Sequence, residues 1–200
     1  MRSKRAAAFL LLGVLCLVGA LGLTGYNLWD EQRAFHSAET GVEQLRAVIP
    51  SKKDSQPLVP QEQVVMPTVP LDGRNYVGVL EIPALDLALP VLDDCTESLL
   101  KVAPCRYKGN LYDGMIVAGH NYRSHFKNLS QLSVGDTLRF IDVDGNVWNY
   151  TVAATEIING YDVEAMERGD WDLTLFTCTY GGKERVTVRC TMDVQVSTQF

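Results

Sequence analysis

The chain has 200 residues, 46% hydrophobic and 21% charged, with a formal net charge of −6 at pH 7. This length accommodates one ordinary domain together with an appended segment. The acidic balance argues against a nucleic-acid-binding surface, because phosphate binding requires an excess or a cluster of basic side chains.

The N-terminal stretch predicts a membrane-spanning helix. An uncharged run of nineteen residues, AAAFLLLGVLCLVGALGLT, follows the basic residues Arg2, Lys4 and Arg5. A helix of this length spans roughly 28 Å, close to the hydrocarbon thickness of a bilayer. The basic flank favours a cytoplasmic N-terminus. A cleaved signal peptide is the alternative, but the run is long and no A-x-A site ends it, so an uncleaved single-pass anchor is favoured.

Two connecting segments follow the anchor. Residues 30–49 contain helix-forming residues, interrupted by Gly41, and predict a juxtamembrane stalk helix. Five of the eight prolines then fall between Pro50 and Pro70, which predicts an extended spacer. We therefore expect an anchor over residues 1–29, a stalk over 30–49, a spacer over 50–74 and a folded domain over 75–200.

Beyond the spacer, short runs of alternating polar and apolar residues predict a mostly β domain, a barrel or a sandwich. Strands are expected at residues 76–82, 87–92, 114–118, 137–142, 148–158, 173–180 and 185–194. Asp144-Gly145 predicts a tight hairpin, because glycine accepts the positive φ of such a turn. Short helices are expected at 96–102 and 163–168.

Cys178 lies near the end of an alternating run, LTLFTCTYGG. A four-residue loop over 181–184 would place Thr187 opposite Cys178 and Arg189 opposite Phe176. Cys178 and Arg189 would then be diagonal neighbours on one face. A guanidinium there stabilises a thiolate or donates hydrogen bonds to a developing oxyanion. Taken alone, the strand pattern favours a structural cysteine.

A histidine at the end of the strand 114–118 changes that balance. In GMIVAGHN, His120 follows an apolar run and is expected to face a groove, where an imidazole holds or relays a proton at neutral pH. A cysteine and a histidine that meet in the fold are the minimal set for acyl transfer through a thioester. His125 is the rival for this role and is predicted to be a surface or packing residue.

Metal binding is not predicted. His120, His125 and Cys178 lack the i, i+4 helical spacing of common zinc sites, and the chain has no CxxC pair. Three acidic residues of the loop 159–172 leave a calcium site open: Asp162, Glu164 and Glu167. A disulfide between Cys95 and Cys105 also stays open, because the sequence gives no Cα separation.

Together these motifs resemble the sortases, the cysteine transpeptidases of Gram-positive cell envelopes. The characteristic TLxTC motif matches residues 174–178, AGHN contains His120, and VTVRC contains Arg189. LSVGDTLRF follows the histidine and also resembles a family segment. The resemblance covers about residues 75–195, and its motifs occur in the right order.

The resemblance implies a closed eight-stranded sortase-type β-barrel with short helices. No cofactor is expected. Cys178 would attack an LPxTG-like sorting signal, His120 would protonate the leaving amine, and Arg189 would stabilise the oxyanion. Thr177 and Asn121 would contact the substrate. An amine from a peptidoglycan precursor or from a pilin lysine would resolve the acyl-enzyme. The compact domain favours a class A-like or class D-like sortase over class B.

Two alternatives remain open at this point. One is an extracytoplasmic thiol peptidase that uses water as its acceptor, and the other is a catalytically silent β-domain that binds envelope components. The presence of all three catalytic residue types favours an enzyme over the silent domain. In the leading hypothesis the protein is anchored in the cell membrane, with its N-terminus in the cytoplasm and its catalytic domain extracellular.

Overall fold

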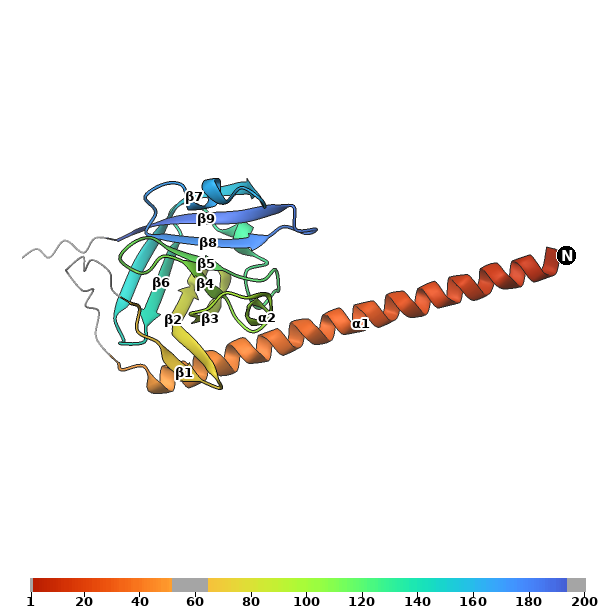
Figure 1. Cartoon of the computed structure of the whole chain (residues 1–200), viewed down its shortest axis with the longest axis horizontal. Helices are drawn as coiled ribbons and strands as arrows, with labels where there is room; N and C mark the ends of the chain where they lie inside the picture. Colours follow the sequence, from red (N-terminus) through yellow and green to blue (C-terminus); the bar gives the residue numbers. More distant parts are fainter. Residues whose placement is uncertain (1, 52–64, 194–200) are drawn as a thin grey trace, which may run out of the picture. The chain divides into compact units, whose positions relative to one another are not determined.

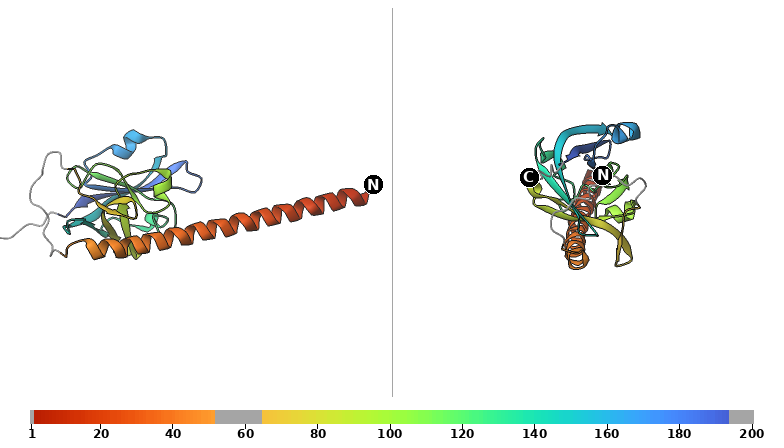
Figure 2. Two further views of the ribbon diagram at one scale, coloured as in Figure 1. Left: turned by 60° about the horizontal axis from the view of Figure 1, so that its bottom comes forward. Right: turned by 90° about the vertical axis from the view of Figure 1, so that its left-hand side faces the viewer.

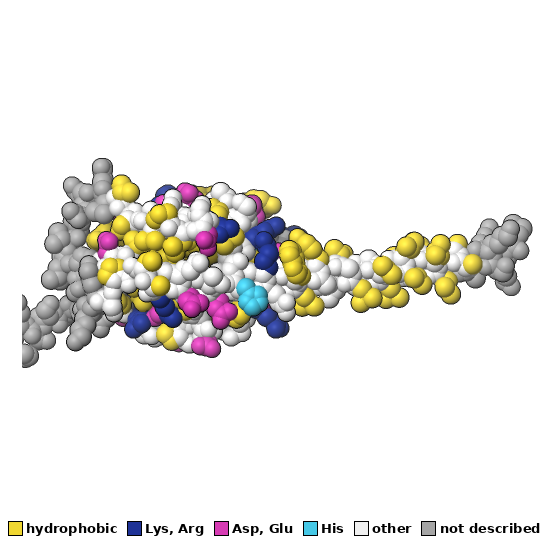
Figure 3. Space-filling model, turned by 90° about the horizontal axis from the view of Figure 1, so that it is seen from below, with side chains coloured by type: hydrophobic (Ala, Val, Ile, Leu, Met, Phe, Trp, Pro, Cys, Tyr) yellow, Lys and Arg dark blue, Asp and Glu magenta, His cyan; other side chains and the backbone are white. Residues whose placement is uncertain are grey.

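The computed structural model describes residues 2–51 and 65–193 and divides the chain into two compact units, Met1–Arg33 and Ala34–Phe200. One continuous helix, α1 (Arg2–Val48), belongs to both units. The apolar side chains of its first part are exposed. The most apolar window of the helix has a mean hydropathy of 2.4, and the helix is long and apolar enough to cross a membrane. Figure 3 shows this stretch covered by hydrophobic side chains on the face in view. The predicted apolar helix is therefore present.

The second unit is built around one β-sheet (Figures 1 and 2). Its strands are β1 (Val69–Leu71), β2 (Arg74–Ile82), β3 (Leu87–Leu92), β4 (Cys105–Lys108), β5 (Met115–Ala118), β6 (Thr137–Asp142), β7 (Val147–Asn159), β8 (Leu173–Cys178) and β9 (Glu184–Met192). Their order is β1-β2-β3-β4-β5-β8-β9-β7-β6, and β2 also pairs with β6. Strands β2 to β9 thus close into a barrel, which confirms the predicted closed eight-stranded architecture.

Short helical segments connect the strands. They are η1 (Pro83–Leu85), α2 (Glu97–Leu100), η2 (Leu129–Gln131) and α3 (Val163–Glu167). The strand that the sequence pattern missed is β4, and β1 is a further short strand that pairs with β2. Most strands enclose the core with alternate residues, so the inward side chains are apolar and fully buried, among them Leu175, Val188 and Trp148.

The β6–β7 hairpin is stabilised by a buried carboxylate. Asp142 accepts hydrogen bonds from the backbone of Asp144 and Asn146 at 3.0 and 2.8 Å, and from Trp148 Nε1 at 3.0 Å. Gly145 adopts φ 80°, as the predicted turn at Asp144-Gly145 requires. One carboxylate therefore satisfies several donors that the turn would otherwise leave without partners.

The C-terminal half of α1 packs against the barrel within the second unit. Ala34, Ala38, Val42 and Leu45 are buried at this contact. The helix continues through Gly41, where an added Cβ would lie 2.9 Å from Cγ of Pro90 on β3. Glycine at this position allows close approach of the helix to the strand, so it does not interrupt the helix.

Candidate active site

Cys178 is the last residue of β8, and its side chain is exposed. Alternation along the strand turns Leu175 and Thr177 into the barrel and places Thr174, Phe176 and Cys178 on the outer face. Thr177 is buried, and its hydroxyl has no hydrogen-bond partner among the described residues. Its side chain therefore lies on the opposite face from the Cys178 thiol.

The strand pairing brings His120 to the same end of the sheet as Cys178. β5 and β8 are parallel, with Ala118 paired to Phe176, and Gly119 N donates to Phe176 O at 3.0 Å. His120 follows Ala118 by two residues, as Cys178 follows Phe176. Because parallel neighbours end on the same edge, the two chemically reactive residues leave adjacent strands side by side.

The turn after β5 fixes the position of His120. An added Cβ on Gly119 would lie 2.3 Å from Cδ2 of Phe126, a fully buried ring, and Phe126 N donates to His120 O at 3.2 Å. Tyr122 stacks on the imidazole with 4.0 Å between ring centroids and 7° between planes. Asn121, which lies between His120 and Tyr122 in the sequence, is half-buried. The histidine ring thus has a packed neighbour that restricts its orientation.

His125 is fully buried. Of the two alternatives predicted for it, a surface residue or a packing residue, the second is therefore confirmed. Neither ring nitrogen has a hydrogen-bond partner in the described part of the chain. Burial, together with the charge of nearby His120, lowers the pKa of His125 to about 4. His125 is therefore neutral at physiological pH and lies behind Tyr122, with 5.4 Å between their ring centroids.

The register of the last hairpin corrects the predicted position of the arginine. Cys178 pairs with Arg185, and Arg189 pairs with Thr174. The prediction that Arg189 is a diagonal neighbour of Cys178 is therefore wrong. Arg189 does share the outer face with Cys178, but it lies four residues away along β8, about 13 Å at the rise of a strand.

The β8–β9 turn explains this register. Thr179 N donates to Glu184 O at 2.9 Å, so pairing continues one step beyond Cys178 and the loop is residues 180–183. Gly181 and Gly182 adopt φ 94° and 74° within it. The loop has the predicted length but begins one residue earlier, which moves β9 two positions along β8. A shift of two residues keeps Arg189 on the same face of the sheet as Cys178 but changes the residue of β8 with which it pairs.

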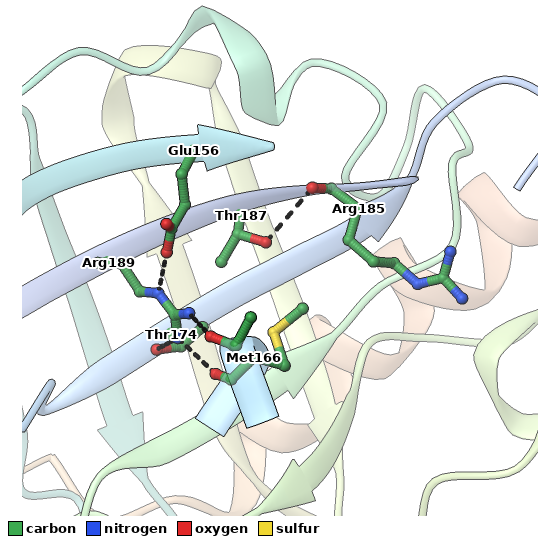
Figure 4. Close-up of polar contacts among 7 residues, drawn as sticks. Glu156, Met166, Thr174, Arg185, Thr187 and Arg189 are labelled. Carbon is green, nitrogen blue, oxygen red and sulfur yellow. Dashed lines mark hydrogen bonds and ion pairs between the residues drawn. The ribbon is translucent and has the colours of Figure 1, made fainter. Parts of the chain in front are cut away.

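Arg185 is half-buried at the turn end of the hairpin. Its Nη1 donates to Gly182 O at 2.9 Å and to Glu184 O at 3.2 Å. Figure 4 shows its guanidinium directed away from that of Arg189, which instead points toward α3. Directly paired residues have Cβ atoms about 4.5–5.5 Å apart, so Arg185 is the arginine that β9 places beside Cys178.

The outer face also bounds a cavity of about 560 Å³. Ile116 and Thr174, paired on β5 and β8, line it together with Arg189 and Met166. Nearer to Cys178, the ring of Tyr107 packs edge-on against Phe176, with centroids 5.5 Å apart. The face that carries Cys178 thus combines apolar and polar side chains along β8.

Two of the three acidic residues that left a calcium site open, Asp162 and Glu167, contact other groups of the protein. Asp162 Oδ1 accepts a hydrogen bond from Ala165 N at 2.9 Å, and Glu167 pairs with Lys108 at 2.6 Å. Within residues 2–51 and 65–193, no group of three or more His, Cys, Asp or Glu side chains is arranged to hold a metal ion.

Cys95 and Cys105 are both free thiols and interact with each other. Their interaction lowers the pKa of Cys95 and, together with burial, raises that of Cys105, whose Sγ donates to Ala103 O at 3.4 Å. Cys190 is buried in the barrel core, and this burial raises its pKa to about 12. Cys178 is the exposed thiol among the cysteines of the barrel.

Comparison with known proteins gives a match over most of the barrel. A family model described as the sortase domain matches residues 80–193. Sortase A of Bacillus anthracis is 30% identical over 115 residues, which cover 54% of this chain and 54% of that protein. The chain therefore spans about half the length of the curated relative that it matches.

Solved structures share the fold. Sortase A from Corynebacterium diphtheriae has a TM-score of 0.54 at 21% identity, covering 63% of this chain and 64% of the other. Sortase C1 from Streptococcus agalactiae gives 0.53 at 22%, covering 63% and 72%. A Clostridium perfringens Sortase D5 transpeptidase gives 0.53 at 18%, covering 60% and 79%. The barrel is of the type that the sequence motifs predicted.

Proposed function

Because the chain belongs to the sortase family, we propose that it is a membrane-anchored cysteine transpeptidase acting on LPxTG-like sorting signals. One observation carries this proposal: Cys178, His120 and Arg185 lie at the same end of the neighbouring strands β8, β5 and β9. An exposed thiol, a proton carrier and a fixed cation at one strand edge are the groups that acyl transfer through a thioester requires.

In the first half-reaction, the Cys178 thiolate attacks the threonine carbonyl of the Thr–Gly bond. Arg185 donates hydrogen bonds to the oxyanion as negative charge develops on that oxygen. His120 then gives its proton to the glycine nitrogen, the C–N bond breaks, and a thioester to Cys178 remains. Arg185 takes the role that the sequence motif gave to Arg189, since Arg185 is the residue paired with Cys178.

In the second half-reaction, an amine of a peptidoglycan precursor or of a pilin lysine attacks the thioester. His120 accepts the proton of that amine, an amide bond forms, and the Cys178 thiolate leaves. The apolar part of α1 would anchor the enzyme, with its N-terminus in the cytoplasm and the barrel outside. Asn121, next to His120 in the β5 turn, is a candidate substrate contact.

The test uses the full chain in detergent micelles with a panel of fluorogenic LPxTG-like peptides, with and without amine acceptors. Acid quenching and mass spectrometry should find an acyl adduct on Cys178, and Cys178→Ala should remove it. Cys95→Ser is the matched control and should retain the adduct. An adduct that survives Cys178→Ala, or a panel that is never cleaved, would refute the proposed function.

The products separate the alternatives. Transfer predicts that an added amine appears covalently bound to the peptide fragment, whereas a thiol peptidase releases the free acid whatever amine is present. A silent binding domain would bind peptide without forming a thioester.

The assignment of Arg185 has its own test. Arg185→Ala should lower kcat by about 10²–10³, the usual effect of removing an oxyanion donor. Lys183→Ala is the matched control, because it removes an exposed cation from the same turn. Equal losses in the two variants would show that only the charge of the turn matters and would contradict the role given to Arg185.

A further inference from the structure

Arg189 is a buried cation whose contacts lie away from Cys178. It is 2% exposed, and its Nε donates to Glu156 Oε1 at 2.7 Å (Figure 4). Its Nη1 donates to Met166 O at 2.6 Å and to Thr174 Oγ1 at 3.1 Å, and its Nη2 donates to Ala165 O at 2.7 Å. A guanidinium buried with this many partners is held in one orientation.

Two of these acceptors belong to α3. The helix has only five residues, too few to be stable alone, and the carbonyls of its last turn have no partner within the helix. Arg189 supplies donors to two of those carbonyls, of Ala165 and Met166. At the other end, Asp162 caps the backbone of Ala165. Side chains therefore hold the single turn of α3 from both ends.

The helix forms part of the wall beside the outer face of β8. Met166 is buried and lines the 560 Å³ cavity together with Thr174 and Arg189. Thr174 lies on the same face as Cys178, about 13 Å away, which is the reach of four extended residues. An extended peptide held at Cys178 and running along β8 in this direction reaches the wall that Arg189 supports.

We propose that Arg189 is a positioning residue, which fixes α3 and with it the β7–β8 connection as one wall of the peptide groove. This inference rests on the proposed function, because it concerns how the substrate is held. Arg189 acts through the backbone of α3 and does not touch the reacting atoms. Its loss should weaken peptide binding more than it slows the chemical step.

Arg189→Lys and Arg189→Met test this in the full chain in detergent micelles. Lysine keeps the charge but lacks the planar fork that reaches two carbonyls at once. For a cleaved fluorogenic LPxTG-like peptide, both variants should raise KM about tenfold while kcat changes less than about threefold. A kcat that falls with KM unchanged would place Arg189 in the chemistry and overturn the proposal.

Trypsin provides a readout that needs no substrate. Arg168 directly follows α3 and is exposed, and cleavage after it requires the surrounding segment to open locally. Cleavage at Arg168, followed by mass spectrometry, should be at least about tenfold faster in both Arg189 variants. Unchanged cleavage in folded variants would show that Arg189 does not hold α3.

Asp162→Ala covers the case in which the Arg189 variants do not fold. Asp162 is exposed and caps the same helix, so its loss should speed cleavage at Arg168 and raise KM without unfolding the barrel. Glu156→Gln is the matched control, because it leaves both carbonyl contacts of Arg189 in place. Asp162→Ala with wild-type cleavage and wild-type KM would overturn the proposal. A wild-type chain that cleaves no peptide would refute the proposed function instead, while the trypsin result would still decide whether Arg189 holds α3.

Discussion

Because His125 is buried, we predict that the free energy of unfolding decreases in mild acid. The pKa of this imidazole falls from 6.5 to about 4 on folding, because burial and nearby His120 disfavour its charged form. Below pH 6.5 the unfolded chain takes up a proton that the folded chain does not, so the free energy of unfolding falls as pH falls from about 6.5 to about 4. The loss amounts to about 2 kcal/mol at pH 5 and about 3 kcal/mol below pH 4.

The assay is urea unfolding of the full chain in detergent micelles, followed by tryptophan fluorescence between pH 7.5 and 4.5. His125→Leu removes the titrating ring, so the free energy of unfolding of this variant should fall by about 2 kcal/mol less than that of wild type between pH 7.5 and 5. His36→Leu is the matched control, since His36 is exposed on α1 and its loss should leave the profile unchanged. Parallel profiles for wild type and His125→Leu would refute the reasoning.

Three substitutions test the packing around the site and the barrel. Gly119→Ala should destabilise the barrel by about 1–3 kcal/mol and lower kcat, because the new methyl group displaces Phe126 and the turn that holds His120. Urea unfolding measures the stability and peptide kinetics measure kcat; wild-type values for both would contradict the packing described. Asp142→Ala should lower the free energy of unfolding, measured in urea, by about 2–4 kcal/mol, because it leaves buried donors without an acceptor. A loss below about 1 kcal/mol would indicate that water replaces the carboxylate. Gly41→Ala should lower the free energy of unfolding by about 1 kcal/mol, because the clash of the new methyl group with Pro90 outweighs the better helix propensity of alanine. A gain in Tm would show that α1 moves away from β3 without cost.

Periodicity predicted most of the barrel because most strands have one buried face. Strands β3 and β6 begin and end at the predicted residues, and β2, β5, β7, β8 and β9 differ by only a few. β4 was missed because it has only four residues, Cys105–Lys108, too few for alternation to stand out. β1 was missed because three residues that include Pro70 do not distinguish a short strand from an extended linker.

The candidate site could be predicted only in part. The motif order indicated His120 and Cys178, and their adjacency follows from a parallel pairing that the local pattern does not specify. The arginine depended on where one glycine-rich turn begins, and a shift of one residue there exchanges Arg189 for Arg185. Turn type is decided by backbone conformations at Gly181 and Gly182, which glycine permits but does not prescribe.

The parallel pairing of β5 with β8 also determines when the reactive arrangement comes into existence. The two strands join residues about 58 positions apart in the chain, and closing so long a loop is among the slower steps in forming a β-barrel. In the proposed topology, His120 leaves the translocation channel first, followed by Cys178 and then by Arg185. The thiol and the imidazole meet only once these two strands pair, so the proposed acyl transfer cannot begin before the barrel closes.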